Sequence, residues 1–321
     1  MSGILVEPAD LSSLPPDPGA GGPAIEGRSP WRLAWARLRS DRVAIVCGSI
    51  ILLITLFAIL APLVAHIAGH GPNDQDLTNG LTPAGLPRGP SGRFWFGTDD
   101  LGRDVLVRVA YGARISLLAG VVASSLACTI GVLVGMTAGY FGGAVDTFLA
   151  RAMDVILSFP FLLFAIALIS LVGPSLAVAI GIIVFFSWAA VGRIVRGQTL
   201  SIKEREYVEA GRSLGASDLR IMFVDIFPNL LAPVLVYLTL LIPASIAFEA
   251  TLSFLGLGVV PPTASWGNML AESLQFYQVA WWFELLPGVF LLVTTLSFNL
   301  LGDSVRDALD PRGERLFRRA R

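Results

Sequence analysis

Long apolar segments that contain no charged residue alternate with shorter polar segments along most of the chain. Five windows lack Asp, Glu, Lys and Arg: 43–73, 115–145, 155–192, 226–248 and 285–302. Each window reaches the length of about 18 apolar residues that a helix needs to cross a bilayer, and the third has room for two helices. The pattern therefore predicts six membrane-spanning helices. They are expected over residues 43–64, 115–139, 155–171, 175–191, 229–250 and 283–301.

Small residues mark one face of the second expected helix. Ala127, Gly131, Gly135 and Gly139 recur at every fourth position, so they lie on one side of a helix. Within a membrane, helices associate through close packing rather than through the hydrophobic effect, and small residues let two backbones approach each other. The spacing predicts that a neighbouring helix packs tightly along this face.

Two segments between the expected spans have features of outer loops. In the first, Thr98 is placed to cap a short helix over 99–111, and Asp104 is spaced to pair with Arg108 one helical turn later. In the second, over 251–283, several glycines and prolines prevent a regular helix. Irregular backbone survives at membrane depth only where protein or water covers its polar groups. This second loop is therefore expected outside the membrane or partly re-entrant.

The composition agrees with a membrane protein and excludes other classes. Of the 321 residues, 54% are hydrophobic and only 15% are charged, whereas about a quarter of the residues in a soluble domain are charged. This balance excludes a soluble enzyme, a nucleic-acid-binding protein and a secreted disulfide scaffold. Cys47 and Cys128 both fall inside charge-free windows, where they are expected as buried apolar residues rather than as a disulfide or a metal pair.

The basic residues lie mainly on one side of the expected bundle. With six spans, both termini share one side of the membrane, and that side collects 18 of the 23 lysine and arginine residues. The segment 193–225 alone has six of them. Because basic residues concentrate on the cytoplasmic side of membrane proteins, both termini and this segment are expected in the cytoplasm.

Few residues within the expected spans suggest chemistry. Glu249 and Asp154 lie near the ends of two spans, and carboxylates inside a membrane are candidates for a substrate path. His66 and His70 are four residues apart, but no cysteine or neighbouring acidic ligand completes a metal site with them, and none is expected. The sequence also lacks the glycine-rich phosphate loop that ends in Gly-Lys-Ser/Thr, so this chain is not expected to bind ATP in that manner.

The longest charged segment between two spans is predicted to fold as two helices joined by a turn. Strong helix formers run from Glu204 to Leu214, and Gly215 supplies the conformation that ends a helix. Ser217 is placed to cap a second helix that runs to Pro228. A helix pair of this kind is suited to docking in a groove of another protein. The alternative is that the segment only connects two spans and is exposed to solvent.

This helix pair resembles the Glu-Ala-Ala loop in the membrane subunits of bacterial ATP-binding-cassette importers. Four residues match that pattern at the family's spacing: Glu209, Ala210, Gly215 and Pro228. Three residues stand where the family has Ala, Ile and Leu: Gly211, Asp225 and Phe227. The glycine is expected to weaken its helix by about 1 kcal/mol. The aspartate is the larger departure, because a charge cannot replace the packing of an isoleucine.

Further motifs resemble the second permease subunit of dipeptide and oligopeptide importers. They are Phe96-Gly97-Thr98-Asp99, Gly102-Arg103-Asp104, Arg108, Tyr111-Gly112, Leu252–Gly258, Pro261-Pro262, Ser265-Trp266-Gly267 and Asp310-Pro311-Arg312. Together with the Glu-Ala-Ala loop, they extend the similarity over about residues 31–313.

The resemblance implies an all-α permease subunit with six transmembrane helices, in the type I (MetI-like) importer fold. It implies a translocation path for di- and oligopeptides in the plasma (inner) membrane of a bacterium. The expected partners are a homologous permease subunit, two ATPase subunits and an extracytoplasmic substrate-binding protein. ATP and magnesium are expected on the ATPase subunits, and neither a cofactor nor a catalytic residue is expected in this chain.

The resemblance also implies roles for particular residues. Coupling to the ATPase is expected over 204–220, through Glu206, Glu209, Ala210, Gly211, Gly215, Ala216 and Asp218. Docking of the binding protein is expected at the outer side, near Asp99, Arg103, Asp104 and Arg108. For the two arginines, ion pairing within the loop is the alternative.

The expected organisation is a disordered tail over 1–30, an N-terminal region with the first span over 31–111, the permease core over 112–304 and a second tail over 305–321. The solute stays open, because an importer of nickel, glutathione or another small solute has the same motifs. An ion-coupled secondary transporter is a more distant alternative. Such a protein needs ion-binding carboxylates or broken helices in paired halves, and the sequence shows no such pairing.

Overall fold

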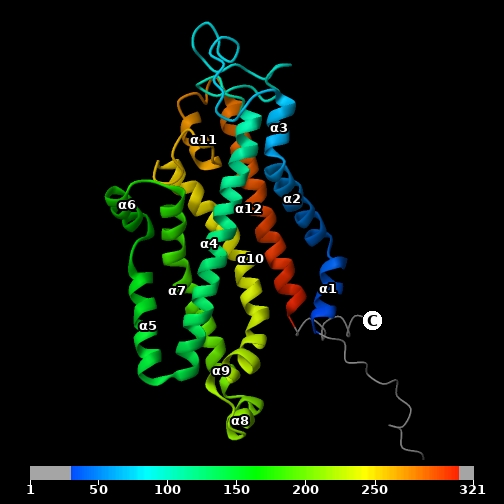
Figure 1. Ribbon diagram of the computed structural model, residues 1–321. Coiled ribbons are helices and arrows are strands. Elements are labelled where there is room, and N and C mark those ends of the chain that lie inside the picture. Colours follow the sequence, from blue (N-terminus) through cyan, green and yellow to red (C-terminus); the bar gives the residue numbers. More distant parts are fainter. Residues whose placement is uncertain (1–29, 311–321) are drawn as a thin grey trace, which may run out of the picture.

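The structure describes residues 30–310, which fold into helices joined by loops, with two isolated β-bridges in place of any strand (Figure 1). In this computed structural model the helices are α1 (Pro30–Ser40), α2 (Arg42–Ile59), α3 (Ala61–Ala68), α4 (Val105–Phe141), α5 (Gly143–Ser158), α6 (Phe161–Val172), α7 (Leu176–Lys203), α8 (Glu206–Ser213), α9 (Asp218–Arg220), a π-helix (Ile221–Ile226), α10 (Phe227–Phe254), α11 (Trp266–Ser273) and α12 (Trp281–Leu309). The predicted all-α class is confirmed. The tail predicted over 1–30 lies outside the described residues except for Pro30.

Within the described residues, five helices are long and apolar enough to cross a membrane. They are α2, α4, α7, the continuous helix Asp218–Phe254 and α12. The third span expected over 155–171 is interrupted, because α5 and α6 are bent by 85° at the break between them. Phe159 is extended there, and Pro160 has no N–H to continue the helical ladder. The two helices make a sixth crossing only as a bent pair.

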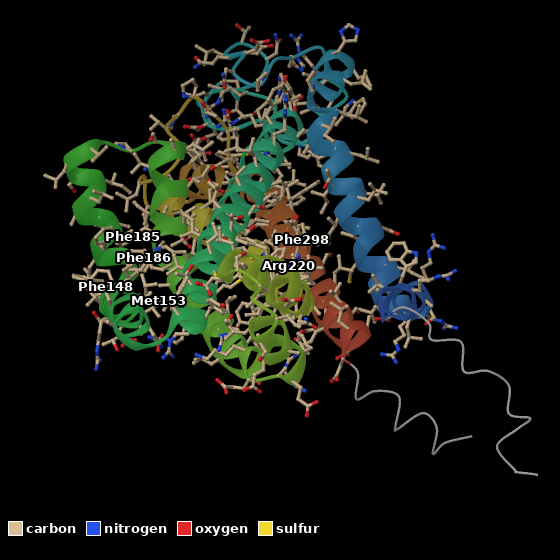
Figure 2. The ribbon with its side chains drawn as sticks, turned by 60° about the horizontal axis from the view of Figure 1, so that its bottom comes forward. Phe148, Met153, Phe185, Phe186, Arg220 and Phe298 are labelled. Atoms are coloured by element: carbon tan, nitrogen blue, oxygen red, sulfur yellow. The ribbon has the colours of Figure 1, made fainter. Side chains whose placement is uncertain are left out.

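The bent pair is held against α7 by aromatic side chains. Phe161 and Phe164 of α6 lie with their ring centroids 5.4 and 5.2 Å from that of Phe186. Phe185 of α7 stacks on Phe164 in turn, with ring centroids 5.2 Å apart, and Figure 2 labels both α7 rings on this side of the bundle. The broken segment therefore packs on the bundle although it is not one straight helix.

The second expected span, 115–139, is the later and larger part of α4, a helix of 37 residues. At about 1.5 Å per residue this helix exceeds the roughly 30 Å of a hydrocarbon core, so it extends beyond the membrane. The separate short helix expected over 99–111 is not formed. Gly102, with a φ of 72°, turns the chain back so that Asp104 caps α4 by accepting a 3.3 Å hydrogen bond from the Val107 amide. Thr98 does not cap it; its hydroxyl donates to the Gly80 carbonyl at 2.5 Å.

The tight packing predicted for the small-residue face of α4 is confirmed, and its neighbour is α7. A Cβ atom added at Gly131 would lie 2.6 Å from the Val191 Cβ, closer than real Cβ atoms approach. A Cβ atom at Gly139 would lie 2.7 Å from the Thr199 Cβ. The two backbones are therefore in direct contact over several turns.

The helices form an elongated bundle with two different ends (Figure 1). The inner end holds α1, α8 and the end of α12, and the outer end holds α11 and the irregular segment between α3 and α4. The Arg37 guanidinium donates to the carbonyl oxygens of Ala308 and Asp310 at 3.4 and 3.1 Å, which ties α1 to the end of α12. The first and last described residues thus share one end. The assignment of that end to the cytoplasm stays a prediction.

Candidate functional site

The coupling segment, residues 204–226, projects from the inner end between α7 and α10 (Figure 1). After α8 the chain turns at Gly215, whose φ of 82° lies in the left-handed region that favours glycine. α9 then leads through the π-helix into α10. The predicted helix, turn and helix are confirmed, but the second helix does not end at Pro228. The wider π-helical turn before this proline accommodates a residue without an N–H, and the helix continues.

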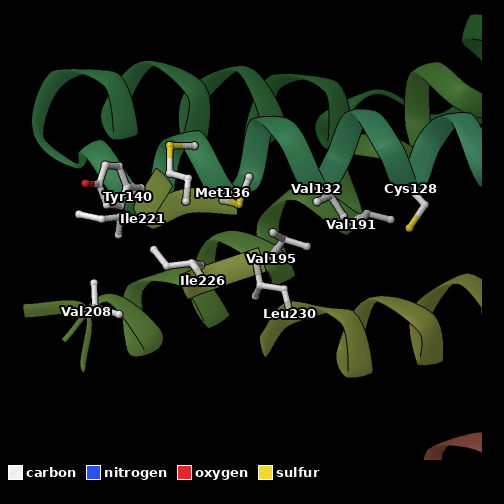
Figure 3. Packing of buried hydrophobic residues seen from close by; sticks show 11 residues of the cluster. Cys128, Val132, Met136, Tyr140, Val191, Val195, Val208, Ile221, Ile226 and Leu230 are labelled. Carbon is white, nitrogen blue, oxygen red and sulfur yellow. The ribbon is translucent and has the colours of Figure 1, made fainter. Parts of the chain in front are cut away.

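Buried apolar side chains hold the coupling segment against α4 and α7 (Figure 3). The cluster contains Cys128, Val132, Met136 and Tyr140 of α4, Val191 and Val195 of α7, Val208 of α8, and Ile221, Met222, Ile226 and Leu230 further on. Val208 is the buried residue of α8, and its side chain is fully covered. Most of the surface of α8 consequently faces outward.

The outward face carries most of the predicted coupling residues. Four of them are exposed or partly exposed and lie outside the apolar cluster: Glu206, Glu209, Ala210 and Gly211. Ala216 is partly buried and packs against that cluster. Leu214 and Leu219 flank the turn and are 89% and 68% exposed. Leucines exposed on a projecting helix pair are typical of a contact with another protein. Sequence reasoning missed both leucines, although an apolar residue beside the predicted turn glycine was a usable signal.

Asp218 differs from the other predicted coupling residues because it binds back to the bundle. Its Oδ1 accepts a 2.7 Å hydrogen bond from the Tyr140 hydroxyl, and the Arg212 guanidinium lies 5.7 Å from the centroid of the same ring. An open cavity of about 370 Å³ adjoins this contact. It is lined by Tyr140, Phe141, Lys203, Glu204, Arg212 and Asp218.

Two departures from the Glu-Ala-Ala pattern lie close together. A Cβ atom added at Gly211 would lie 3.6 Å from Oδ2 of Asp225. Asp225 is only half-buried, so its carboxylate is not forced into the apolar cluster beneath the segment. The packing fault expected from a charge at this position therefore does not arise.

An ion cluster is buried in the outer cap, which comprises residues 69–104 and 255–280. Arg103 Nε lies 2.5 Å from Asp99 Oδ2, and Arg103 Nη2 lies 3.0 Å from Glu272 Oε2. Arg108 of α4 approaches the same two carboxylates at 3.2 and 3.1 Å. Two arginines thus share two carboxylates, and the cluster joins the first outer loop to α4 and α11.

The predicted pair of Asp104 with Arg108 is wrong, because Asp104 caps α4 and lies 3.4 Å from the His70 Nδ1. Asp99, Asp104 and both arginines are at most 3% exposed. In this conformation their side chains are not accessible to a binding protein. Arg103 and Arg108 form ion pairs inside the cap, which was the alternative to docking. Docking on the outer cap as a whole stays a prediction.

Burial dominates the titration of the acidic groups in the cap. It raises the pKa of Glu272 and Asp100 above their ordinary values, while the neighbouring arginines act in the opposite direction. Burial also raises the pKa of Asp104. Oxygen atoms of Asp99, Asp100 and Glu272 lie within 4.8 Å of one another. The two guanidinium groups already supply positive charge at this position, so the cluster offers a metal cation no favourable site.

Glu249 is fully buried in the outer half of α10. Its carboxylate accepts hydrogen bonds of 2.7 Å from Ser253 and 2.8 Å from Ser116 of α4. The Ser116 hydroxyl accepts in turn from the Trp266 amide of α11 at 3.4 Å. The carboxylate thus joins three elements, and the predicted contact with a solute requires a conformation in which α4 and α10 separate.

Asp154 lies on α5, in the inner half of the bundle, so the structure does not bring it near Glu249. Its side chain is 49% exposed and pairs with Arg193 of α7 at 2.6 Å. One turn further along α7, Arg196 pairs with Asp146. The two ion pairs connect α5 with α7 at the inner end.

Two family models match the chain. Residues 131–315 match the binding-protein-dependent transport system inner membrane component, and residues 29–84 match the N-terminal transmembrane domain of oligopeptide transport permease C. The chain is 41% identical to the dipeptide transport system permease protein of Alkalihalophilus pseudofirmus, over 88% of this chain and 90% of that protein. It is 43% identical to the oligopeptide transport system permease protein of Escherichia coli strain K12, over 90% and 93%.

Among solved structures, an inward-facing conformation of the MetNI methionine ABC transporter is similar in fold. The TM-score is 0.53 at 18% identity, and the similar part covers 64% of this chain and 96% of the other. The predicted MetI-like fold and the multi-pass inner-membrane location are thus confirmed. The chain belongs to the family of binding-protein-dependent transport system inner membrane components, the permease subunits of ATP-binding-cassette importers.

Proposed function

We propose that this chain forms part of the translocation path for di- and oligopeptides and is driven through its coupling segment by separate ATPase subunits. In this proposal it pairs with a homologous permease subunit, binds two ATPase subunits at its inner end and receives solute from an extracytoplasmic binding protein at its outer cap. The observation that carries the proposal is the exposed helix pair at the inner end, which is continuous with a spanning helix. The names of the dipeptide and oligopeptide permease relatives support the solute class.

The geometry suggests how motion passes through the chain. α8 presents Glu209 and Leu214 to a partner groove, while Val208 anchors the helix to the bundle. Since α9, the π-helix and α10 are continuous over Asp218–Phe254, a displacement of the coupling segment moves the inner end of α10 directly. The outer half of this helix carries Glu249, which binds Ser116 of α4. Closure of the ATPases can therefore change the separation of α4 and α10 at the outer end.

The chemistry of ATP hydrolysis belongs to the partners in this proposal. ATP and magnesium bind the ATPase subunits, and this chain contributes no nucleotide site. The lack of a glycine-rich phosphate loop in the sequence supports this division. Glu249 and, with less support, Asp154 are proposed to face the solute when the helices separate. The exposed parts of the outer cap are proposed to contact the binding protein.

Uptake by the reconstituted complex tests the proposal. The chain, its partner permease and both ATPases are placed in vesicles, and the binding protein is loaded with labelled peptide, nickel or glutathione in separate reactions. ATP-dependent uptake of peptide is expected, and a Walker-lysine variant of the ATPases should abolish it. Uptake of nickel or glutathione in place of peptide would overturn the solute assignment. Uptake driven by a proton or sodium gradient without ATP would overturn the importer class.

Gly215→Arg tests the coupling role of the segment. An L-residue in the left-handed conformation costs about 1–2 kcal/mol, so the turn between α8 and α9 should be displaced. The variant should insert in the membrane normally and lose ATP-driven uptake. Gly197→Arg on the exposed surface of α7, where an added Cβ meets no atom within 4 Å, is the matched control and should keep uptake. Normal uptake by Gly215→Arg would contradict the coupling assignment.

A further inference from the structure

Tyr140 touches both halves of the coupling segment from outside it. This residue lies one position before the end of α4. Its hydroxyl donates to Asp218, the first residue of α9, at 2.7 Å, and its ring lies 5.7 Å from the guanidinium of Arg212 in α8. The two contacts lie on opposite sides of the turn at Gly215. One side chain of α4 therefore fixes how α8 and α9 are set relative to each other.

The ring of Tyr140 is firmly placed while its hydroxyl reaches a polar surface. The residue is 6% exposed and belongs to the apolar cluster with Met136, Val208 and Ile221 (Figure 3). Asp218 is exposed, and both residues line the open cavity at the inner end. Packing therefore orients the ring, and the hydroxyl adds a directional hydrogen bond to the carboxylate at the start of α9. Hydrogen bonds to charged groups are the stronger ones in proteins.

α4 is placed to transmit a displacement from this contact to the rest of the bundle. Its middle packs backbone to backbone on α7 through Gly131 and Gly139, and its other end carries Arg108 of the buried outer cluster. Helices packed at such short distances move as a unit, because well-packed interfaces do not deform continuously. A displacement of α9 that reaches Tyr140 is thus delivered to α4 and α7 as well as to α10.

We infer that Tyr140 is a positioning residue that links the coupling segment to α4 through its hydrogen bond to Asp218. The inference rests on the proposed function, since it assumes that the coupling segment transmits the motion of an ATPase. Without the hydroxyl, the segment still follows α10, to which it is continuous, and still packs on α4 through the apolar cluster, but α9 loses its directional bond to α4 and α4 follows less closely. Loss of the hydroxyl consequently separates ATP hydrolysis from solute movement instead of stopping assembly.

Tyr140→Phe in the complete reconstituted complex is the first test. Phenylalanine keeps the ring, its packing and its contact with Arg212, so assembly and ATP hydrolysis should be retained. Peptide uptake per ATP hydrolysed should fall about tenfold or more, as expected for loss of a hydrogen bond to a charged group. Tyr111→Phe, on the same helix with Arg114 5.6 Å from its ring centroid, is the matched control and should leave this ratio unchanged.

Variants of Asp218 test whether the two residues act as a unit. Asp218→Ala should reproduce the loss in coupling ratio, and adding Tyr140→Phe should lower the ratio no further, because both changes remove the same bond. Asp218→Asn retains an acceptor oxygen and should restore most of the ratio. Fully additive losses, or a normal ratio in Tyr140→Phe, would overturn the inference. So would an equal fall of uptake and ATP hydrolysis, which indicates a purely structural role.

Hydrogen exchange separates this inference from the proposed function. Backbone amides over 206–218 should exchange faster in the Tyr140→Phe complex than in wild type, and the Tyr111→Phe complex should match wild type. This measurement needs no solute. If no peptide uptake is found for the wild-type complex, the proposed function fails while faster exchange still supports the positioning of the segment by Tyr140. Unchanged exchange in an active complex would count against Tyr140 alone.

Discussion

Glycines in the middle of α4 determine how closely α7 can approach. Their spacing of four residues was sufficient to predict the contact, because helical periodicity places them on one face and the membrane favours small residues there. The identity of the neighbouring helix could not be predicted from the same pattern. The partner that Arg103 and Arg108 share on α11 could not be predicted either, because Glu272 lies 164 positions after Arg108. The spacing of residues along the sequence predicts neighbours within one helix, but it does not predict contacts between residues that are far apart in the chain.

Gly131→Leu should destabilise the bundle. A Cβ atom at this position would lie 2.6 Å from the Val191 Cβ and 2.8 Å from the Trp188 carbonyl oxygen, so the backbones must separate. Overpacking of this kind costs about 1–3 kcal/mol. The apparent melting temperature of the purified protein in detergent should fall. Gly181→Leu on α7 is the control, because an added Cβ there meets no atom within 4 Å. Equal melting temperatures for the two variants would contradict the packing argument.

Element boundaries depend on local chemistry that periodicity does not report. The charge-free windows located the spans, yet α7 continues to Lys203 and α12 to Leu309, well past the apolar residues. Charged residues are good helix formers, so a helix can continue after it leaves the membrane. The bend between α5 and α6 followed from Pro160, which sequence reasoning left within one span. The coupling segment was predictable because its turn glycine marks the end of α8. Ser217 stands at the N-cap position of α9 as expected, but its side chain makes no cap hydrogen bond.

Asp104→Ala should weaken the start of α4. The Asp104 carboxylate accepts from the Val107 amide, and loss of an N-cap of this type costs about 0.5–2 kcal/mol. The amides of the first turn of α4 should then exchange hydrogen faster, and the melting temperature should fall. Asp104→Asn keeps an oxygen that can accept the same bond and should lie close to wild type. If the asparagine variant is as unstable as the alanine variant, the charge facing His70 matters more than the cap.

At the scale of the molecule, the bundle is tied together differently at its two ends. The inner end is joined by an apolar cluster beneath the coupling segment, and the outer end by buried ions and the hydrogen bonds of Glu249. The positions of five spanning helices and the shared end of the first and last described residues followed from hydrophobic windows alone. The buried ion cluster did not, because charged residues in a predicted loop are ordinarily expected at the surface. The docking role was assigned to those residues because they were expected on the outer side of a permease subunit.

The stability of the outer cap should increase on mild acidification. Burial raises the pKa of Glu272 above its ordinary value of 4.5, so in the folded state this group takes up a proton at a higher pH than in the unfolded state. The contribution of Glu272 to the free energy of unfolding therefore grows as the pH falls through its folded pKa toward 4.5. Melting temperatures of wild type and Glu272→Gln, measured between about pH 5 and 8, should show a steeper rise toward acid in wild type. A rise that is steeper in the variant would refute this assignment.

The buried ion cluster also determines when the outer cap can fold during synthesis of the chain. Because synthesis proceeds from the N-terminus, Arg103 and Arg108 reach the outer side long before Glu272 leaves the ribosome. During that interval two guanidinium groups face Asp99 without their second carboxylate. The cap can close only after α10 has been inserted and α11 has followed it. A nascent chain arrested before α11 thus lacks the carboxylate that Arg103 and Arg108 share with each other across the cap, so its outer cap stays open.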